Sequence, residues 1–556
     1  MTVLTRAERP SRPQPARRGR VLGSVVLLLA FYALLLALGD SRAGSVADVG
    51  GKLATAKVLA EGDATSMDVG YWAEDLDPDG VFHPLANTAA FAEDWVQGTS
   101  APYSLLTGAL WRIAGPPAVA LLSMLAAAAA AAAAGRLARR LGAGDGRLAF
   151  WIVGLATPVA VYALDGWEHA PGLALVLWGV VLGLEAERPA VAAAAGALLS
   201  ASTLLRADLG AYVLAFGVTC LVVGSVRCRW FRRPVCLAAA ALGAFAPLIA
   251  NGLLERRLLG TGVRDARASA GASGTGHDIG QRITDALLTG TGLFPDEAPL
   301  ALGAGVALLA ALLVLAARVA KVPWATDQLT RVAGVLVLLL YGARLLDGLG
   351  FVPGAVAAMP LVVLAAVASR NDDTRVVLGT ALGAVPLVWM LQWSGNHVPQ
   401  WGGRYLLLTT VLLTVVATVT ITERGVRAGP MPLLLGLTVV VASFGLLWHV
   451  QRTDIVGAAA AVVTATPEDS VVVSLHPQLG REFGAWYGDT RWLSADPTSV
   501  DDAVAVAREA APDHIVLVER PSVEATAVTV PGYELSSEAT VPYLGGSLLT
   551  RTWTRG

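Results

Sequence analysis

Long apolar runs separated by short polar connectors occupy most of residues 21–449. A run of about 18 or more apolar residues is long enough to cross a bilayer as a helix. The pattern predicts about thirteen transmembrane helices, and hence a polytopic α-helical membrane protein. Their expected extents are 21–39, 116–138, 147–164, 169–186, 189–205, 208–226, 234–254, 299–318, 330–347, 351–369, 376–393, 402–421 and 431–449.

The pattern changes after about residue 452, where short β-rich runs alternate with a helical segment. Ser470–Leu475 and His514–Glu519 read as strands, Thr498–Ala511 reads as a helix, and Leu548–Trp553 is a candidate third strand. This pattern predicts a small α/β domain over residues 453–556. It contains no glycine-rich phosphate loop and no catalytic triad, which favours a structural or acceptor-docking role.

Composition excludes a soluble protein of this length: 55% of residues are hydrophobic, only 15% are charged, and the mean hydropathy is +0.59. Charge then sets the orientation, because cytoplasmic connectors carry an excess of Lys and Arg. The basic tail, residues 1–20, and the basic connector Arg227–Arg233 both fall on one side. An N-terminus in the cytoplasm, an uncleaved first helix, an extracytoplasmic C-terminus and a location in the plasma membrane are therefore expected.

The first connector on the opposite side, residues 40–115, is long and rich in Asp, His and Trp. Val46–Glu61 and Tyr103–Ile113 have helical apolar spacing but are too short to span, so they are expected to lie along the membrane surface. Tyr71–Thr99 between them is turn-rich, and Asp77–Gly80 reads as a turn. We expect this loop to roof a site at the membrane surface.

Ionisable residues at helix ends that face a shared cavity are functional candidates. Carboxylates suit removal of a proton from a hydroxyl, and Arg suits a bidentate grip on a phosphate. The candidates on this side of the membrane are Asp48, Lys52, Trp72, Glu74, Asp75, Asp77, His83, Glu168, His169, Arg206, His397 and Arg404.

Several short motifs follow one another along this side of the membrane. They are Asp48–Ala56 with the turn at Gly62 and Asp63, then Trp167–His169, Leu204–Arg206, Gly290–Phe294 and Trp401–Leu406. In order and sidedness they resemble the GT-C superfamily of polytopic glycosyltransferases, which includes protein O-mannosyltransferases and lipid A aminoarabinose transferases. The resemblance covers most of residues 20–450.

The resemblance implies transfer of a sugar, with inversion, from a polyprenyl-phosphate donor to a glycan, lipid or protein acceptor of the cell envelope. It implies an acidic base early in the first external loop, which is Asp48 by position. Many relatives have Asp-Glu there, whereas Val49 follows Asp48 here, so Asp75 or Asp77 would have to supply a second carboxylate. Arg404, Arg206 and His397 are the expected phosphate ligands. The Ala, Gly and Arg content resembles that of a high-GC actinobacterium, where arabinan, mannan or mannosylated protein would be acceptors.

We expect no cofactor and no nucleic-acid partner. No nucleotide-sugar site is expected either, because the leaving group is already lipid-borne. No metal is expected, because His83 and His277 lack partners at metal-ligand spacing. The other eight candidates, which are Lys52, Trp72, Glu74, Asp75, Asp77, His83, Glu168 and His169, are expected to contact substrate.

Other interpretations stay open at this stage. Asp48 would also stabilise the start of a surface helix through the helix dipole, and Asp40 is a rival for the base. Arg206 would also reach the lipid headgroups, and Trp72 would also serve as an interface anchor. A lipid-linked-glycan flippase, or a non-catalytic envelope scaffold, are the alternatives to an enzyme.

Overall fold

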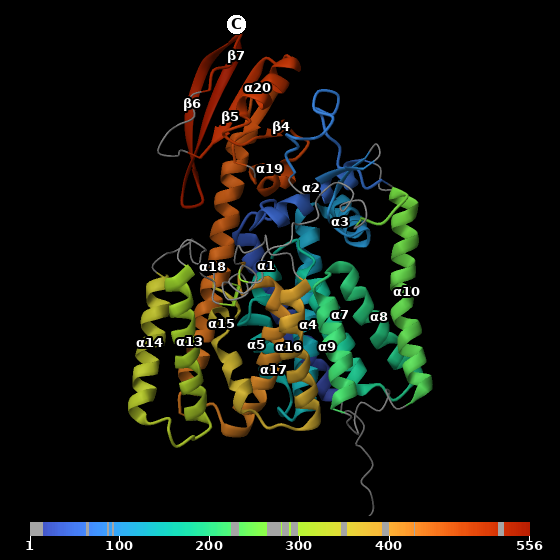
Figure 1. Cartoon of the computed structure of the whole chain (residues 1–556), viewed down its shortest axis with the longest axis vertical. Coiled ribbons are helices and arrows are strands. Elements are labelled where there is room, and N and C mark those ends of the chain that lie inside the picture. The colour runs from blue at the N-terminus through green and yellow to red at the C-terminus, as the bar shows by residue number, and fades with distance from the viewer. Residues whose placement is uncertain are drawn as a thin grey trace, which may run out of the picture.

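The structure is a computed structural model. It describes residues 15–62, 66–85, 88–91, 94–223, 233–263, 280, 289–290, 298–345, 353–391, 400–427, 429–476, 478–520 and 528–556. Two parts stand one above the other: a bundle of roughly parallel helices, and a C-terminal β-sheet at what we call its upper end (Figure 1). The expected residues His277 and His397 lie outside the described residues.

The bundle contains helices of very different lengths. They are α1 (Pro15–Leu38), α4 (Pro116–Leu141), α5 (Arg147–Leu155), α6 (Val159–Tyr162), α7 (His169–Glu185), α8 (Pro189–Leu205), α9 (Leu209–Val222), α10 (Pro234–Leu259), α13 (Ala298–Val319), α14 (Asp327–Leu345), α15 (Ala355–Ala358), the 3-10 helix η4 (Pro360–Val367), α16 (Asp372–Leu391), the 3-10 helix η5 (Arg404–Leu406), α17 (Leu407–Arg424) and α18 (Met431–Thr464). They fall near the segments that hydropathy predicts.

In the described part of the chain, five helices are long and apolar enough to cross a membrane: α1, α4, α10, α17 with η5, and α18. Shorter apolar helices of 10–17 residues are α7, α8, α9 and part of α13. These helices support a membrane protein, while the expected count of about thirteen spans remains a prediction. Two predicted spans are not continuous α-helices, since Pro158 separates α5 from α6 and Pro360 begins the 3-10 helix η4.

Burial along the helices matches a lipid environment. On α10 large apolar side chains, among them Leu242 and Phe245, are exposed. Only 6% of the most apolar stretch of this helix is buried inside the protein. On α4 the alanines of the run at 126–134 are mostly buried against neighbouring helices, as expected from their small size. The bundle therefore packs through small residues inside and presents large apolar residues outside.

The loop between α1 and α4 folds over the upper end of the bundle (Figure 1). It contains α2 (Ala47–Glu61) and α3 (Ala101–Ala114), which agree with the two predicted surface helices. It also contains a small antiparallel hairpin, β1 (Thr88–Phe91) and β2 (Asp94–Gln97), in the segment predicted to be rich in turns.

The C-terminal part is a five-stranded mixed sheet in the order β4-β3-β5-β7-β6. Its strands are β3 (Ser470–Ser474), β4 (Arg491–Ser494), β5 (His514–Glu519), β6 (Tyr533–Tyr543) and β7 (Gly546–Arg555), with α19 (Leu479–Glu482), the 3-10 helix η6 (Gly484–Trp486) and α20 (Val500–Glu509) between them. The central strands β3 and β5 are apolar and buried because parallel strands are covered on both faces. The outermost strand, β6, is mostly exposed and polar.

One hydrophobic cluster joins the sheet to the loop after α1. It includes Val471, Leu517 and Trp553 of the sheet together with Phe82 and Trp95 of the loop. The membrane helix α18 extends 34 residues, to Thr464, and so continues well beyond the predicted end at residue 449 up to the sheet. The C-terminal sheet is therefore packed onto the upper end of the bundle rather than tethered by a flexible linker.

Two glycines allow this packing to be close. A Cβ atom on Gly484 would lie 1.7 Å from the carbonyl oxygen of Gly50, and a Cβ on Gly50 would lie 1.7 Å from the carbonyl oxygen of Arg481. Both distances are far inside van der Waals contact, and both partners are backbone atoms that cannot swing away. The backbones of α2 and of the segment from α19 to η6 thus meet directly.

We predict that Gly484→Ala lowers the free energy of unfolding of the chain in detergent by about 1–3 kcal/mol, and with it the melting temperature, because an added methyl group overpacks this contact. It should also speed tryptic release of the C-terminal sheet. Gly436→Ala is the matched control, since a Cβ there has nothing within 4 Å. Equal melting temperatures for the two variants would show that the contact is not needed for packing.

Candidate functional site

Charged side chains from five segments of the chain converge below α2, at the upper end of the bundle. We call this group the Asp48 cluster. It consists of Asp48 and Lys52 from α2, Glu168 and His169 at the start of α7, Arg206 and Asp208 between α8 and α9, Arg404 from η5, and Arg481 from α19. Six of these eight residues are among the candidates expected from sequence.

Asp48 lies in the first turn of α2 and carries no capping bond to its own helix. Instead, its Oδ2 accepts a hydrogen bond of 2.6 Å from Nη1 of Arg404, and its Oδ1 accepts one from Nη2 of Arg481. Both guanidinium groups are buried, with side-chain exposures of 7% and 6%. One carboxylate thus bridges arginines that lie 356 and 433 residues away in the sequence.

Arg404 is positioned by the two glycines before it. Gly402 and Gly403 have φ angles of +73° and +61°, which favour glycine, and a Cβ on Gly402 would lie 2.2 Å from Pro158. These glycines therefore let the backbone before Arg404 approach Pro158 closely. This approach aims the Arg404 side chain under α2, with its Cζ 4.6 Å from the ring centre of Tyr405 and 5.5 Å from that of Trp167.

Lys52 lies one turn after Asp48 on the same face of α2. Its Nζ is 3.3 Å from Oε2 of Glu168 and 3.2 Å from Oγ1 of Thr99. The side chains of Lys52 and Glu168 are only 11% and 12% exposed. The second Lys52 contact also links α2 to the loop just before α3.

Arg206 follows the last turn of α8 and occupies the far side of the cluster. Its Nη2 lies 2.9 Å from Oδ1 of Asp208, and its Nη1 lies 2.7 Å from Nε2 of His169. The His169 ring stacks on Tyr162 at 4.8 Å between ring centres. Arg206 is therefore held by protein groups within the cluster and does not extend to the lipid headgroups, where snorkelling would place it.

The environment of Asp48 keeps it ionised. Burial alone would raise its pKa, but the positive charges of Arg404, Arg481 and Lys52 outweigh burial and lower the pKa of Asp48 well below the usual range. Because the pKa is lowered on folding, the ion pairs stabilise the fold fully above the pKa of an unfolded aspartate, about 3.9. That stabilisation is lost only as the pH falls through the folded pKa.

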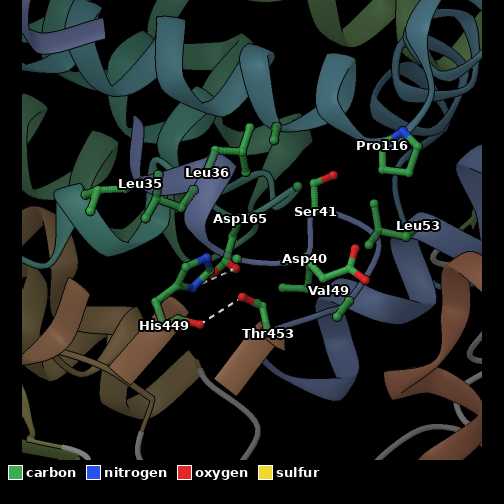
Figure 2. Close-up of a pocket in the computed structure, with 15 residues that line it drawn as sticks. Leu35, Leu36, Asp40, Ser41, Val49, Leu53, Pro116, Asp165, His449 and Thr453 are labelled. Atoms are coloured by element: carbon green, nitrogen blue, oxygen red, sulfur yellow. Dashed lines mark hydrogen bonds and ion pairs between the residues drawn. The ribbon is translucent and has the colours of Figure 1, made fainter. Parts of the chain in front are cut away.

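A small cleft lies beside the cluster, on the neighbouring face of α2 (Figure 2). Val49 and Leu53 line it from α2, roughly 100° around the helix from Asp48 and Lys52. Asp165 and His449 line it side by side, with 3.5 Å between Oδ1 and Nδ1. Asp40, the rival candidate base, also lines this cleft and pairs with Arg42.

Five of the expected substrate ligands do not join the Asp48 cluster. Asp77 accepts hydrogen bonds from Tyr71 Oη and from the backbone of residues 81 and 82, so its carboxylate closes a turn. His83 is buried in an aromatic stack with Trp95, and Trp72 donates to the carbonyl of Trp492. Glu74 and Asp75 are exposed on the same loop. This loop packs against the C-terminal sheet, which explains why its polar residues serve the fold.

Local sequence does not mark Arg481 as a site residue. It lies in a four-residue helix of a domain without a recognisable motif, and only the packing of that domain on α2 brings it to Asp48. The nearby glycines Gly480 and Gly484 indicate close packing at this segment, but they do not indicate a ligand.

The cluster suits recognition of an anion by guanidinium groups and handling of a proton by a carboxylate. Within the residues that the structure describes, no group of three or more His, Cys, Asp or Glu side chains is arranged to hold a metal ion.

Comparisons with known proteins find similarity among solved structures only. The sequence matches no protein-family model and no curated protein. One solved structure to which the chain is similar is ArnT from Cupriavidus metallidurans in the apo state, with 14% identity and a TM-score of 0.40 over 96% of this chain and 98% of that one.

Proposed function

We propose that the protein is a membrane glycosyltransferase of the GT-C type, which transfers a sugar from a polyprenyl-phosphate donor to a cell-envelope acceptor on the extracytoplasmic face, with inversion. The observation that carries this proposal is the contact between Asp48 and Arg404. It joins a carboxylate from the first loop to a guanidinium from η5, late in the chain. The contact lies at the upper end of the bundle.

Phosphate recognition is assigned to the arginines. Arg404 is buried and fixed in direction by Gly402 and Gly403, so little conformational entropy is lost when it binds a phosphate. Arg206 and Lys52 lie around it in the same cluster, which adds positive charge where the leaving phosphate develops negative charge. A buried site strengthens these interactions relative to water.

Proton transfer is assigned to Asp48. Its carboxylate is paired with two arginines, which makes it a weak base in this arrangement. A bound donor phosphate would compete for Arg404 and so release one carboxylate oxygen and raise its basicity. The acceptor oxygen then forms a bond to the anomeric carbon, and its proton passes to Asp48. The bond between that carbon and the phosphate oxygen breaks, and its electron pair stays on the phosphate oxygen.

The arrangement of charge also argues against a flippase. A flippase needs a polar path across the bilayer, and charged residues within transmembrane segments mark such paths. The described charges of this site gather instead at helix ends on one face, next to the C-terminal sheet. A surface reaction at one leaflet accounts for this one-sided placement.

We predict that Asp48→Asn lowers glycosyl transfer by a factor of roughly 10²–10⁴, the usual contribution of a general base. The measurement is linkage analysis of envelope glycans in a deletion strain complemented at equal expression. Glu61→Gln, on the exposed end of the same helix, is the matched control and should restore transfer fully. Full restoration by Asp48→Asn would remove Asp48 as the base and reopen the transport and scaffold alternatives.

We also predict that kcat/KM for the lipid-linked donor shows no acid limb above about pH 5, because kcat/KM reports the free enzyme and the pKa of free Asp48 is lowered. Transfer by purified protein between pH 5 and 8 tests this. If kcat/KM instead falls on the acid side of neutral pH, and the pH of that fall shifts in Arg404→Lys, then Asp48 titrates in that range. That result would contradict the ion pairs described.

A further inference from the structure

Arg481 is the member of the Asp48 cluster that comes from the C-terminal sheet. Its Nη2 donates to Asp48 and its Nη1 donates to Oε1 of Gln478 at 3.0 Å. Within the described part of the chain, its Nε atom is buried and has no hydrogen-bond partner. The Nε atom of Arg404, which grips the other oxygen of Asp48, is also buried and unpaired in that set.

A purely structural role explains this arrangement poorly. Removing a guanidinium group from water costs several kcal/mol, and the attraction of a partner offsets that cost only when the remaining N–H groups are also satisfied. Here two buried guanidinium groups share a single carboxylate, and each keeps an unused donor. Each of these donors can therefore serve a further acceptor that the described residues do not provide.

The charges of the cluster point the same way. Among the described residues, the cations Lys52, Arg206, Arg404 and Arg481 are paired with the carboxylates of Asp48, Glu168 and Asp208. Glu482 also lies near Arg481, but it is paired with Arg452 outside the cluster. One positive charge is therefore left over in a largely buried site. A phosphodiester carries one negative charge and offers acceptor oxygens to both guanidinium groups, so it would complete the balance.

We propose that Arg481 is a second ligand of the donor phosphate, so that the C-terminal sheet completes the phosphate site across the boundary between the two parts of the fold. This inference rests on the proposed function and deepens it. The phosphate takes the place of Asp48 on both guanidinium groups, and the freed carboxylate then faces the acceptor. The site is thus complete only when α19 is seated on α2.

The test measures binding of a polyprenyl phosphate to the full chain in detergent, by native mass spectrometry, with inorganic phosphate as a second probe. Arg481→Gln should weaken polyprenyl phosphate binding at least tenfold, and Arg481→Lys should weaken it less because the charge is kept. Inorganic phosphate should bind more weakly than the lipid and compete with it. Equal affinity of the wild type for the two probes would overturn the lipid source of the anion.

A matched variant separates phosphate binding from packing of the sheet. Arg452 donates to the carbonyl of Ser45 and lies 3.6 Å from Glu482, so it also holds α19 in place, but it does not contact Asp48. Arg452→Gln should lower the melting temperature and leave phosphate binding within about twofold. If Arg452→Gln and Arg481→Gln weaken binding equally, or if Arg481→Gln binds as the wild type does, Arg481 is only a packing contact and the inference is wrong.

The outcome can be told apart from failure of the proposed function. Binding that depends on Arg481 in a protein that transfers no sugar would leave the anion site standing and refute the enzyme. If transfer depends on Asp48 but donor binding does not depend on Arg481, the enzyme stands and the role of Arg481 in the anion site is refuted.

Discussion

The carboxylate of Asp48, held between Arg404 and Arg481, is the interaction on which the rest of the upper end depends. It joins α2, the start of α17 and the C-terminal sheet at a single point. Charges this deeply placed are tolerated only when they are paired, because each isolated ion would cost several kcal/mol. The segments that bear them must therefore arrive together, and the glycines at positions 50, 402, 403 and 484 let their backbones come close enough.

Much of the fold follows from local sequence. Hydropathy located most helices, and amphipathic spacing located α2 and α3 within a residue or two. The failures occur where a neighbour overrides the local pattern. Proline divides one apolar run after α5, the hairpin of β1 and β2 forms only by pairing, and α18 continues through polar residues 451–454 into a second apolar run.

The candidate site was partly predictable for a related reason. Glu168, His169, Arg206 and Arg404 stand out as polar residues at the ends of apolar runs, where burial in lipid would exclude them. Asp48 lies inside the first loop, and only its position in the GT-C resemblance singled it out. Within the loop, no such contrast separates a ligand from a structural residue. Asp77 and His83 therefore looked like Asp48, yet they close a turn and fill an aromatic core, and Arg481 was indistinguishable from any arginine of a small α/β domain.

Asp48 is far in sequence from both of its arginine partners, and this separation has a consequence for how the protein is made. Asp48 enters the membrane surface early in synthesis, whereas Arg481 is added 433 residues later. Throughout that interval the nascent chain holds a charged first loop whose partner does not yet exist. A ribosome that stops before α19 leaves a polypeptide with its hydrophobic helices in place and Asp48 without its second arginine. Assembly of the upper end therefore has to wait until α19 has been synthesised.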